Sequence, residues 1–221
     1  MPNYDNTLAT GYNRAAALAL LVGSAAGILV MATHPTGRDV VHNASTGGSN
    51  ALVSLVHAVA IIGEALVLSG ALAIVARLDA RRDLATAGYV FFALGGVAVI
   101  IAAVASGFLA PATVRGIADV DAVERAGMLN DLHYTGMINQ AFVRMSVILT
   151  GVALLIWSAA IIATKAFTPG LAVFGIVLAA ALLIGVGSGY LRLNIHGYGL
   201  VVLGTGLWQV LIAMALWRSR G

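Results

Sequence analysis

The stretch from Ala51 to Ala76, ALVSLVHAVAIIGEALVLSGALAIVA, decides how the chain folds. It contains no Lys or Arg, and Glu64 is its only carboxylate. An α-helix needs about 20 mostly apolar residues to cross the hydrocarbon core of a bilayer, and this stretch is longer than that. It therefore predicts one membrane-spanning helix.

The same pattern occurs in five further runs. These five runs predict spans at about 14–33, 84–110, 137–163, 168–188 and 196–217, in addition to the span at 51–76. The composition agrees, since 60% of the 221 residues are hydrophobic and 10% are charged, whereas soluble domains are about 25% charged. The two-residue alternation of a membrane β-barrel is absent. We therefore expect a single all-α membrane domain over residues 1–221, a bundle of six transmembrane helices.

The basic residues predict how the bundle is oriented. With six spans, both termini share one side with the loops near residues 80 and 165. That side holds Arg14, Arg77, Arg81, Arg82, Lys165, Arg218 and Arg220, and the other holds Arg38, Arg115, Arg125 and Arg192. Because cytoplasmic loops are enriched in Lys and Arg, both termini are expected in the cytoplasm. We expect the chain to be an integral protein of a bacterial inner (plasma) membrane, with its site on the extracytoplasmic side.

Two outer connections are longer than simple turns. Residues 34–50 are rich in Gly, Ser, Thr and Asn and lack a helical period, so they are expected to form an extracytoplasmic cap or a flexible loop. Residues 117–136 are expected either to form a short surface helix or to continue directly into the fourth span.

Several function classes are excluded or disfavoured. The chain has no Cys, so disulfides, thiolate metal sites and Cys nucleophiles are absent. It has no HExxH motif, phosphate-binding loop or Ser nucleophile elbow, which disfavours hydrolytic chemistry. The basic residues are scattered, so the pI of 9.6 does not indicate a nucleic-acid partner. The expected partners are the lipid bilayer and a second copy of the chain, through Gly-rich helix faces such as Gly23xxxGly27 and Gly185xxxGly189.

Glu64 and the histidines predict a polar site in the outer half of the membrane. All five histidines, His34, His42, His57, His133 and His196, fall in the outer loops or the outer third of a span. His57 precedes Glu64 by seven residues, so the two share a helix face about 10 Å apart along the axis. A carboxylate near the middle of a bilayer is costly unless it is paired, protonated or hydrated, and such residues mark functional sites.

Spans one and four each carry a stripe of possible ligands. Met31 and His34 are spaced i,i+3, and His133 and Met137 are spaced i,i+4. Either spacing places both side chains on one helix face, and thioether with imidazole favours Cu(I). Gln140 and Arg144 continue the second stripe. If spans two and four touch, Arg144 and Glu64 are predicted to form a buried ion pair.

Three functional hypotheses follow from these residues. The first is a site for haem b or a transition metal, copper first, used for redox chemistry or metal handling. Haem would take His57 with a second axial His, such as His196, and would have Arg144 near its propionates. Zinc, which would need histidines with Asp or Glu, is ranked lower. The second hypothesis is a small proton-coupled transporter or channel using Glu64. The third is a non-catalytic accessory membrane subunit.

Overall fold

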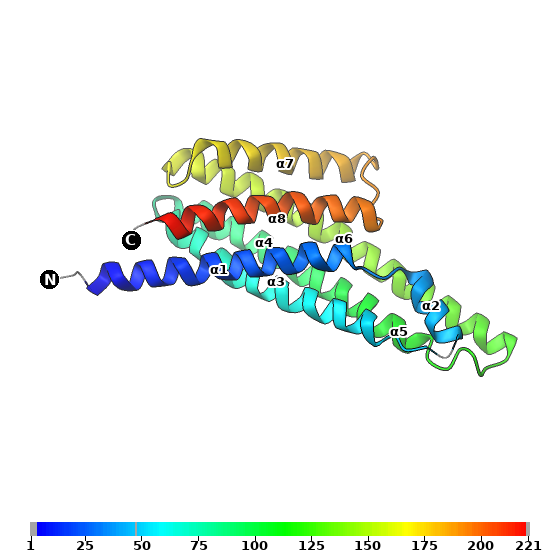
Figure 1. Ribbon diagram of the computed structural model, residues 1–221. Coiled ribbons are helices and arrows are strands. Elements are labelled where there is room, and N and C mark those ends of the chain that lie inside the picture. The colour runs from blue at the N-terminus through cyan, green and yellow to red at the C-terminus, as the bar shows by residue number, and fades with distance from the viewer. Residues whose placement is uncertain (1–3, 47, 220–221) are drawn as a thin grey trace.

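The structure, a computed structural model, describes residues 4–46 and 48–219. Six of its helices are long and apolar enough to cross a membrane. They are α1 (Tyr4–Ala32), α3 (Ala51–Arg77), α4 (Arg82–Val104), α6 (Ala122–Thr164), α7 (Pro169–Gly187) and α8 (Ile195–Arg218). No strand occurs in the described residues (Figure 1). The predicted all-α bundle of six transmembrane helices is confirmed.

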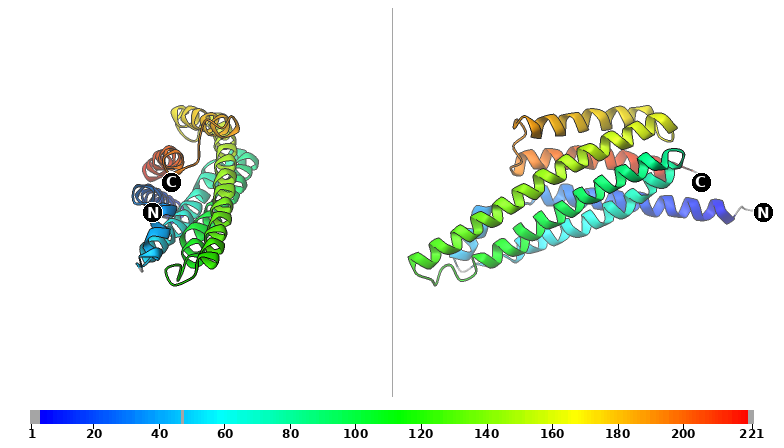
Figure 2. Two further views of the ribbon diagram at one scale, coloured as in Figure 1. Left: turned by 90° about the vertical axis from the view of Figure 1, so that its right-hand side faces the viewer. Right: turned by 180° about the vertical axis from the view of Figure 1, so that it is seen from behind.

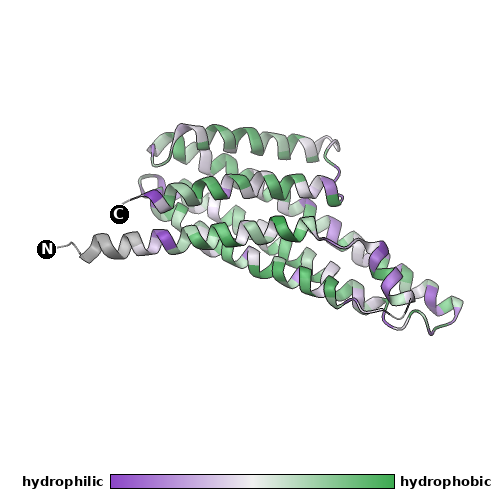
Figure 3. Cartoon of the chain, in the orientation of Figure 1, coloured by the Kyte–Doolittle hydropathy of each residue, from purple (hydrophilic) through white to green (hydrophobic). Residues whose placement is uncertain are grey.

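Successive spans run antiparallel, and each packs against the next in chain order. α1 also packs against α8, which brings the first and last spans together (Figure 1). Both termini consequently lie at one end of the bundle, here called the terminal end (Figure 2). At the opposite end, here called the cap end, lie α2 (Gly37–Ser45), α5 (Ala110–Thr113) and the first turns of α6. Hydrophilic residues gather at the cap end, while the six helices between the ends are mostly hydrophobic (Figure 3).

The cap contains a helix where the sequence showed no helical period. The expected loop at residues 34–50 includes α2, whose N-cap is Thr36. The backbone N–H of Asp39 donates to the Thr36 hydroxyl, and the Asp39 carboxylate accepts from the Thr36 backbone N–H at 2.6 Å. These bonds from the Thr36 backbone and side chain lower the pKa of Asp39 below its ordinary value. A capping box of this kind starts a helix from local hydrogen bonds, which an apolar-period search does not detect.

The fourth span begins earlier than predicted. α6 starts at Ala122 rather than near residue 137, so residues 122–136 continue directly into the span. The Asp121 carboxylate caps this start by accepting from the backbone N–H groups of Val123 and Glu124 at 2.8 and 3.0 Å. At 1.5 Å per residue the helix is about 65 Å long, well beyond a bilayer core. The first span also begins earlier, because α1 starts at Tyr4 and not at residue 14. The predicted spans 51–76, 168–188 and 196–217 agree with α3, α7 and α8 to within one residue at each end.

Close backbone contact joins α1 to α3. A Cβ placed on Gly23 would lie 2.5 Å from the Gly63 carbonyl oxygen, and one on Gly70 would lie 2.7 Å from the Ala16 carbonyl oxygen. Only glycine fits where two helix backbones approach this closely. Gly27 and Gly204 likewise face α8 and α7 of the same chain. Gly23 and Gly27 of the first motif are thus used for packing within one chain, whereas a Cβ on Gly189 of the second would have no atom within 4 Å.

The terminal half of the bundle is filled by aromatic side chains. Trp157 of α6 and Trp208 of α8 are both fully buried and stack with ring centroids 5.8 Å apart and planes 4° apart. Their indole N–H groups donate to the carbonyls of Ala85 and Leu171 at 3.0 and 3.2 Å. Phe92 of α4 packs on Trp157 at 5.1 Å. Since the polar ends of both indoles are satisfied, this packing can lie in the apolar core without an unpaired donor.

The α1–α3 contact predicts different outcomes for two glycines four residues apart. Gly23→Ala forces the helices apart, and overpacking of this kind costs roughly 1–3 kcal/mol. Gly27→Ala is the matched control, because its Cβ would meet Val202 at an ordinary contact distance of 3.6 Å. We expect Gly23→Ala to lower the Tm of the detergent-solubilised protein clearly more than Gly27→Ala does. Equal Tm values would contradict the close approach of α1 and α3.

Candidate functional site

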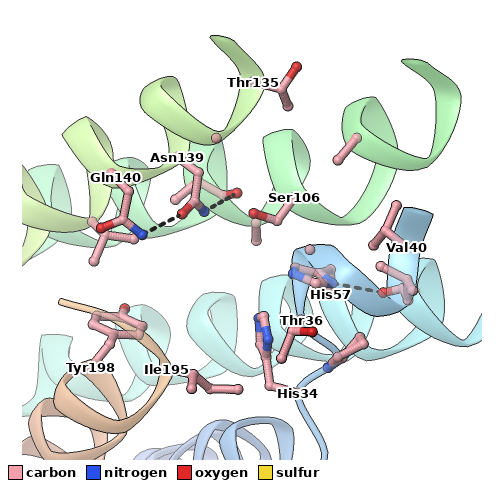
Figure 4. A pocket seen from close by; sticks show the side chains of 18 of the residues that line it. His34, Thr36, Val40, His57, Ser106, Thr135, Asn139, Gln140, Ile195 and Tyr198 are labelled. Carbon is pink, nitrogen blue, oxygen red and sulfur yellow. Dashed lines mark hydrogen bonds between the residues drawn. The ribbon is translucent and has the colours of Figure 1, made fainter. Parts of the chain in front are cut away.

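A cavity of about 680 Å³ lies toward the cap end, between α1, α3, α4, α6 and α8. Its walls are mostly apolar. The polar side chains that border it include His34, His57, Ser106, Asn139, Gln140 and Tyr198 (Figure 4). Small-molecule sites typically enclose about 300–1,000 Å³ within apolar walls and a few polar groups. We call this space the outer cavity.

Two histidines from different helices meet at the wall of the outer cavity. His34 follows the end of α1, and His57 lies two turns into α3, so antiparallel packing brings them to the same level. Their ring centroids are 4.8 Å apart with the planes at 70°, an edge-to-face contact (Figure 4). His57 is 3% exposed. The pair is thus built by the α1–α3 packing, with His57 buried and His34 partly exposed.

Each of these rings has one nitrogen without a partner. Nδ1 of His57 lies 2.7 Å from the Val53 carbonyl oxygen, and since a carbonyl only accepts, Nδ1 carries the hydrogen. Nε2 of His57 therefore presents a lone pair. It is buried without a hydrogen-bond partner, and so is Nδ1 of His34. Buried polar atoms are nearly always paired, so the free nitrogens of these adjacent rings mark a candidate ligand-binding site.

The charge state of His34 suits ligand binding. Burial and the neighbouring His57 lower the pKa of His34 below its ordinary value of 6.5. The ring is therefore neutral at pH 7 and keeps a free lone pair, as a metal ligand or hydrogen-bond acceptor requires.

A π-helical turn supports His57 from the other side. Residues Ala105–Leu109 form this turn, and a Cβ added to Gly107 would collide with the His57 side chain. The Gly107 carbonyl accepts from the Ser54 hydroxyl at 2.7 Å, and the Ala102 carbonyl accepts from the Asn139 amide at 3.0 Å. π-turns are rare and occur frequently at functional sites. Sequence reasoning missed this turn, for which a Ser-Gly pair within an apolar run was the only local signal.

Most of the predicted ligands border the outer cavity. They are Met31, His34, His57, His133, Met137 and Gln140. His196 does not border it; its side chain is exposed and faces a groove of about 600 Å³ that Met31 and His34 also border. His42 is exposed on α2, away from the other histidines. Six of the predicted residues thus border one space, whereas Glu64 and Arg144 do not border it.

The predicted ion pair between Arg144 and Glu64 is absent. Arg144 is exposed, and within the described residues ion pairs form only between Arg81 and Asp83 and between Arg82 and Asp79. α4 packs between α3 and α6. At the level of Arg144, the inward positions of α6 are taken by buried Val143 and Val147. One residue of rotation, about 100°, is enough to turn Arg144 outward.

Glu64 borders a second, smaller space at the middle of the bundle, which we call the inner chamber. It encloses about 120 Å³, and Glu64 is the central residue of α3. The other polar side chains around it are Ser24, Ser146, Thr150, Tyr198, Thr205 and Gln209. The Ser24 hydroxyl donates to Gln209 Oε1 at 2.7 Å, which links α1 to α8. Gln209 was not predicted as a site residue, because it lies on a different face of α8 from His196. An amide near the middle of a span was nevertheless a signal of a site.

Comparison with protein-family models finds no match, and no curated protein or solved structure matches the chain either. The function of the chain is therefore inferred from the geometry of the outer cavity and the inner chamber.

The π-turn contact predicts that Gly107→Ala displaces the His57 ring and lowers the Tm, because the added methyl overlaps His57. Gly136→Ala is the control, since a Cβ there has no atom within 4 Å and alanine favours a helix. The measurement is thermal unfolding of both variants beside the parent. If Gly107→Ala matches the parent, the tight packing of the turn on His57 is refuted.

Proposed function

We propose that the chain binds one transition-metal ion, copper first, through His34 and His57, and uses it for metal handling or electron transfer at the cap end. The observation that carries this proposal is the pair of adjacent rings whose free nitrogens are buried without partners. Two imidazoles on one tetrahedral ion, with metal–nitrogen distances of about 2.0–2.1 Å, have ring centroids roughly 5 Å apart. The observed separation of 4.8 Å is close to that value.

The available ligands favour copper over zinc. Protein zinc sites use three or four side-chain ligands. Among the described residues, no group of three or more His, Asp or Glu side chains is placed to hold a metal. Two imidazoles with a thioether suit Cu(I), and Met31 borders the outer cavity beside His34.

The geometry gives less support to haem b. Two axial histidines lie on opposite faces of the porphyrin, which places their centroids about 6 Å apart with the macrocycle between them. His34 and His57 are in edge contact, so no slot exists between their rings. No Lys or Arg is found among the residues that border the outer cavity, so propionates would lack cations there. Arg144 and His196, both considered for haem, do not border it.

We also propose that the cap end faces the extracytoplasmic side of a bacterial inner membrane. The support is the charge distribution: Arg14, Arg77, Arg81, Arg82, Lys165 and Arg218 belong to the terminal end, against Arg38, Arg115, Arg125 and Arg192 at the cap end. The positive-inside rule then puts both termini in the cytoplasm.

The metal proposal predicts the metal content of purified variants. Protein loaded with Cu(I) and desalted is expected to retain about one copper ion per chain by elemental analysis, because two imidazoles are available to each ion. His34→Ala and His57→Ala are expected to lose it. His42→Ala is the matched control, since His42 is exposed on α2 and should leave copper binding unchanged.

Gel-filtration profiles of the same samples separate loss of the ligand from loss of the fold. Copper retention in folded His34→Ala and His57→Ala would refute the proposal. A metal-free parent after loading would refute it as well. A Soret band in the purified parent would show that the cofactor is haem and not copper.

The orientation can be tested with single cysteines, because the chain has none of its own. Thr46→Cys at the cap end and Thr168→Cys at the terminal end are both exposed positions. In intact cells, a membrane-impermeant maleimide is expected to label Thr46→Cys, and to label Thr168→Cys only after the inner membrane is permeabilised. The reverse pattern would invert the proposed topology.

A further inference from the structure

The inner chamber lies deeper in the bundle than the outer cavity. Both spaces are bordered by Val30, Met31, Ala60, Val99 and Tyr198, which therefore lie between them. Toward the terminal end, the stacked pair Trp157 and Trp208 fills the bundle.

Glu64 brings a carboxyl group without a charged partner into this chamber. Its side chain lies against the backbone of α4, where a Cβ on Gly96 would be 2.6 Å from Oε1. Within the described residues Glu64 takes part in no ion pair. No Lys or Arg is among the residues that border the chamber. Because an unpaired carboxylate at mid-membrane is costly, the group is either protonated or paired with a cation, and a small cation would stabilise its ionised form.

Three of the hydroxyl groups around Glu64 present acceptors. Each Ser or Thr hydroxyl has one hydrogen to donate. Ser24 donates it to Gln209 Oε1 at 2.7 Å, Ser146 to the Val143 carbonyl at 2.8 Å, and Thr205 to the Val201 carbonyl at 2.8 Å. The oxygen lone pairs of these three groups remain free to bind a ligand, and they favour a cation over an anion.

We propose that the inner chamber binds one small monovalent cation, with the size and hardness of an alkali-metal ion, on Glu64 and the surrounding hydroxyl oxygens. A space of about 120 Å³ holds roughly four waters, which excludes larger organic cations. Hard cations prefer oxygen ligands of this kind. One positive charge neutralises the single carboxylate, whereas a divalent ion would leave a net charge buried in the membrane. This site is independent of the proposed metal site in the outer cavity.

The test is the thermal stability of the purified, detergent-solubilised chain in LiCl, NaCl or KCl, with choline chloride keeping the ionic strength constant. A ligand that binds only the folded state begins to raise the Tm near its Kd and then raises it with the logarithm of its concentration. We expect such a rise, of several degrees, for at least one alkali ion and none for choline. Glu64→Gln keeps the side-chain volume and should abolish the rise.

Control variants make the outcome specific. Glu124→Gln neutralises an exposed carboxylate at the start of α6 and should keep the full rise. His57→Ala should also keep it, which separates this site from the metal site. If Glu64→Gln does not fold, Thr205→Val removes one oxygen ligand and should raise several-fold the ion concentration at which the Tm begins to rise. An equal response in Glu64→Gln, an unchanged onset concentration in Thr205→Val, or no ion-specific rise in the parent would overturn the proposal.

Discussion

The backbone contact between α1 and α3 is the constraint on which the functional regions depend. Gly23 and Gly63 let the two helices approach so closely that no side chain fits between them. With this register fixed, the end of α1 lies beside the second turn of α3, and His34 meets His57. The same register brings Ser24 to the wall of the chamber that Glu64 borders. One helix pair therefore positions both the histidine pair and the carboxylate.

The other helices complete each space in a different way. At the outer cavity, the π-turn after α4 packs Gly107 on His57 and offers carbonyls to Ser54 and Asn139. At the inner chamber, α8 supplies Gln209 as the partner of Ser24. Polar groups in a bilayer must be satisfied within the protein, so each of these bonds also holds helices together. Among the buried atoms without a partner are one nitrogen of His34 and one of His57, in adjacent rings at the outer cavity, and Ser158 Oγ, which borders neither space.

Much of the fold could be predicted from the sequence, because hydropathy over about 20 residues reports directly on membrane spans. The start of α6 and the helix α2 were harder, since both depend on local caps, at Asp121 and Thr36, rather than on apolar periodicity. Sequence reasoning found the cavity-lining face of α6 at His133, Met137 and Gln140. It then erred at Arg144, because a helix wheel alone does not say which of two adjacent residues its neighbours will bury.

X-ray absorption at the copper edge of the Cu(I)-loaded protein tests directly whether His34 and His57 hold one metal ion. Scattering from two imidazole nitrogens at about 2.0 Å is expected, reduced to one or lost when either histidine is replaced by alanine. A spectrum without imidazole scattering, or one unchanged in both alanine variants, would contradict it.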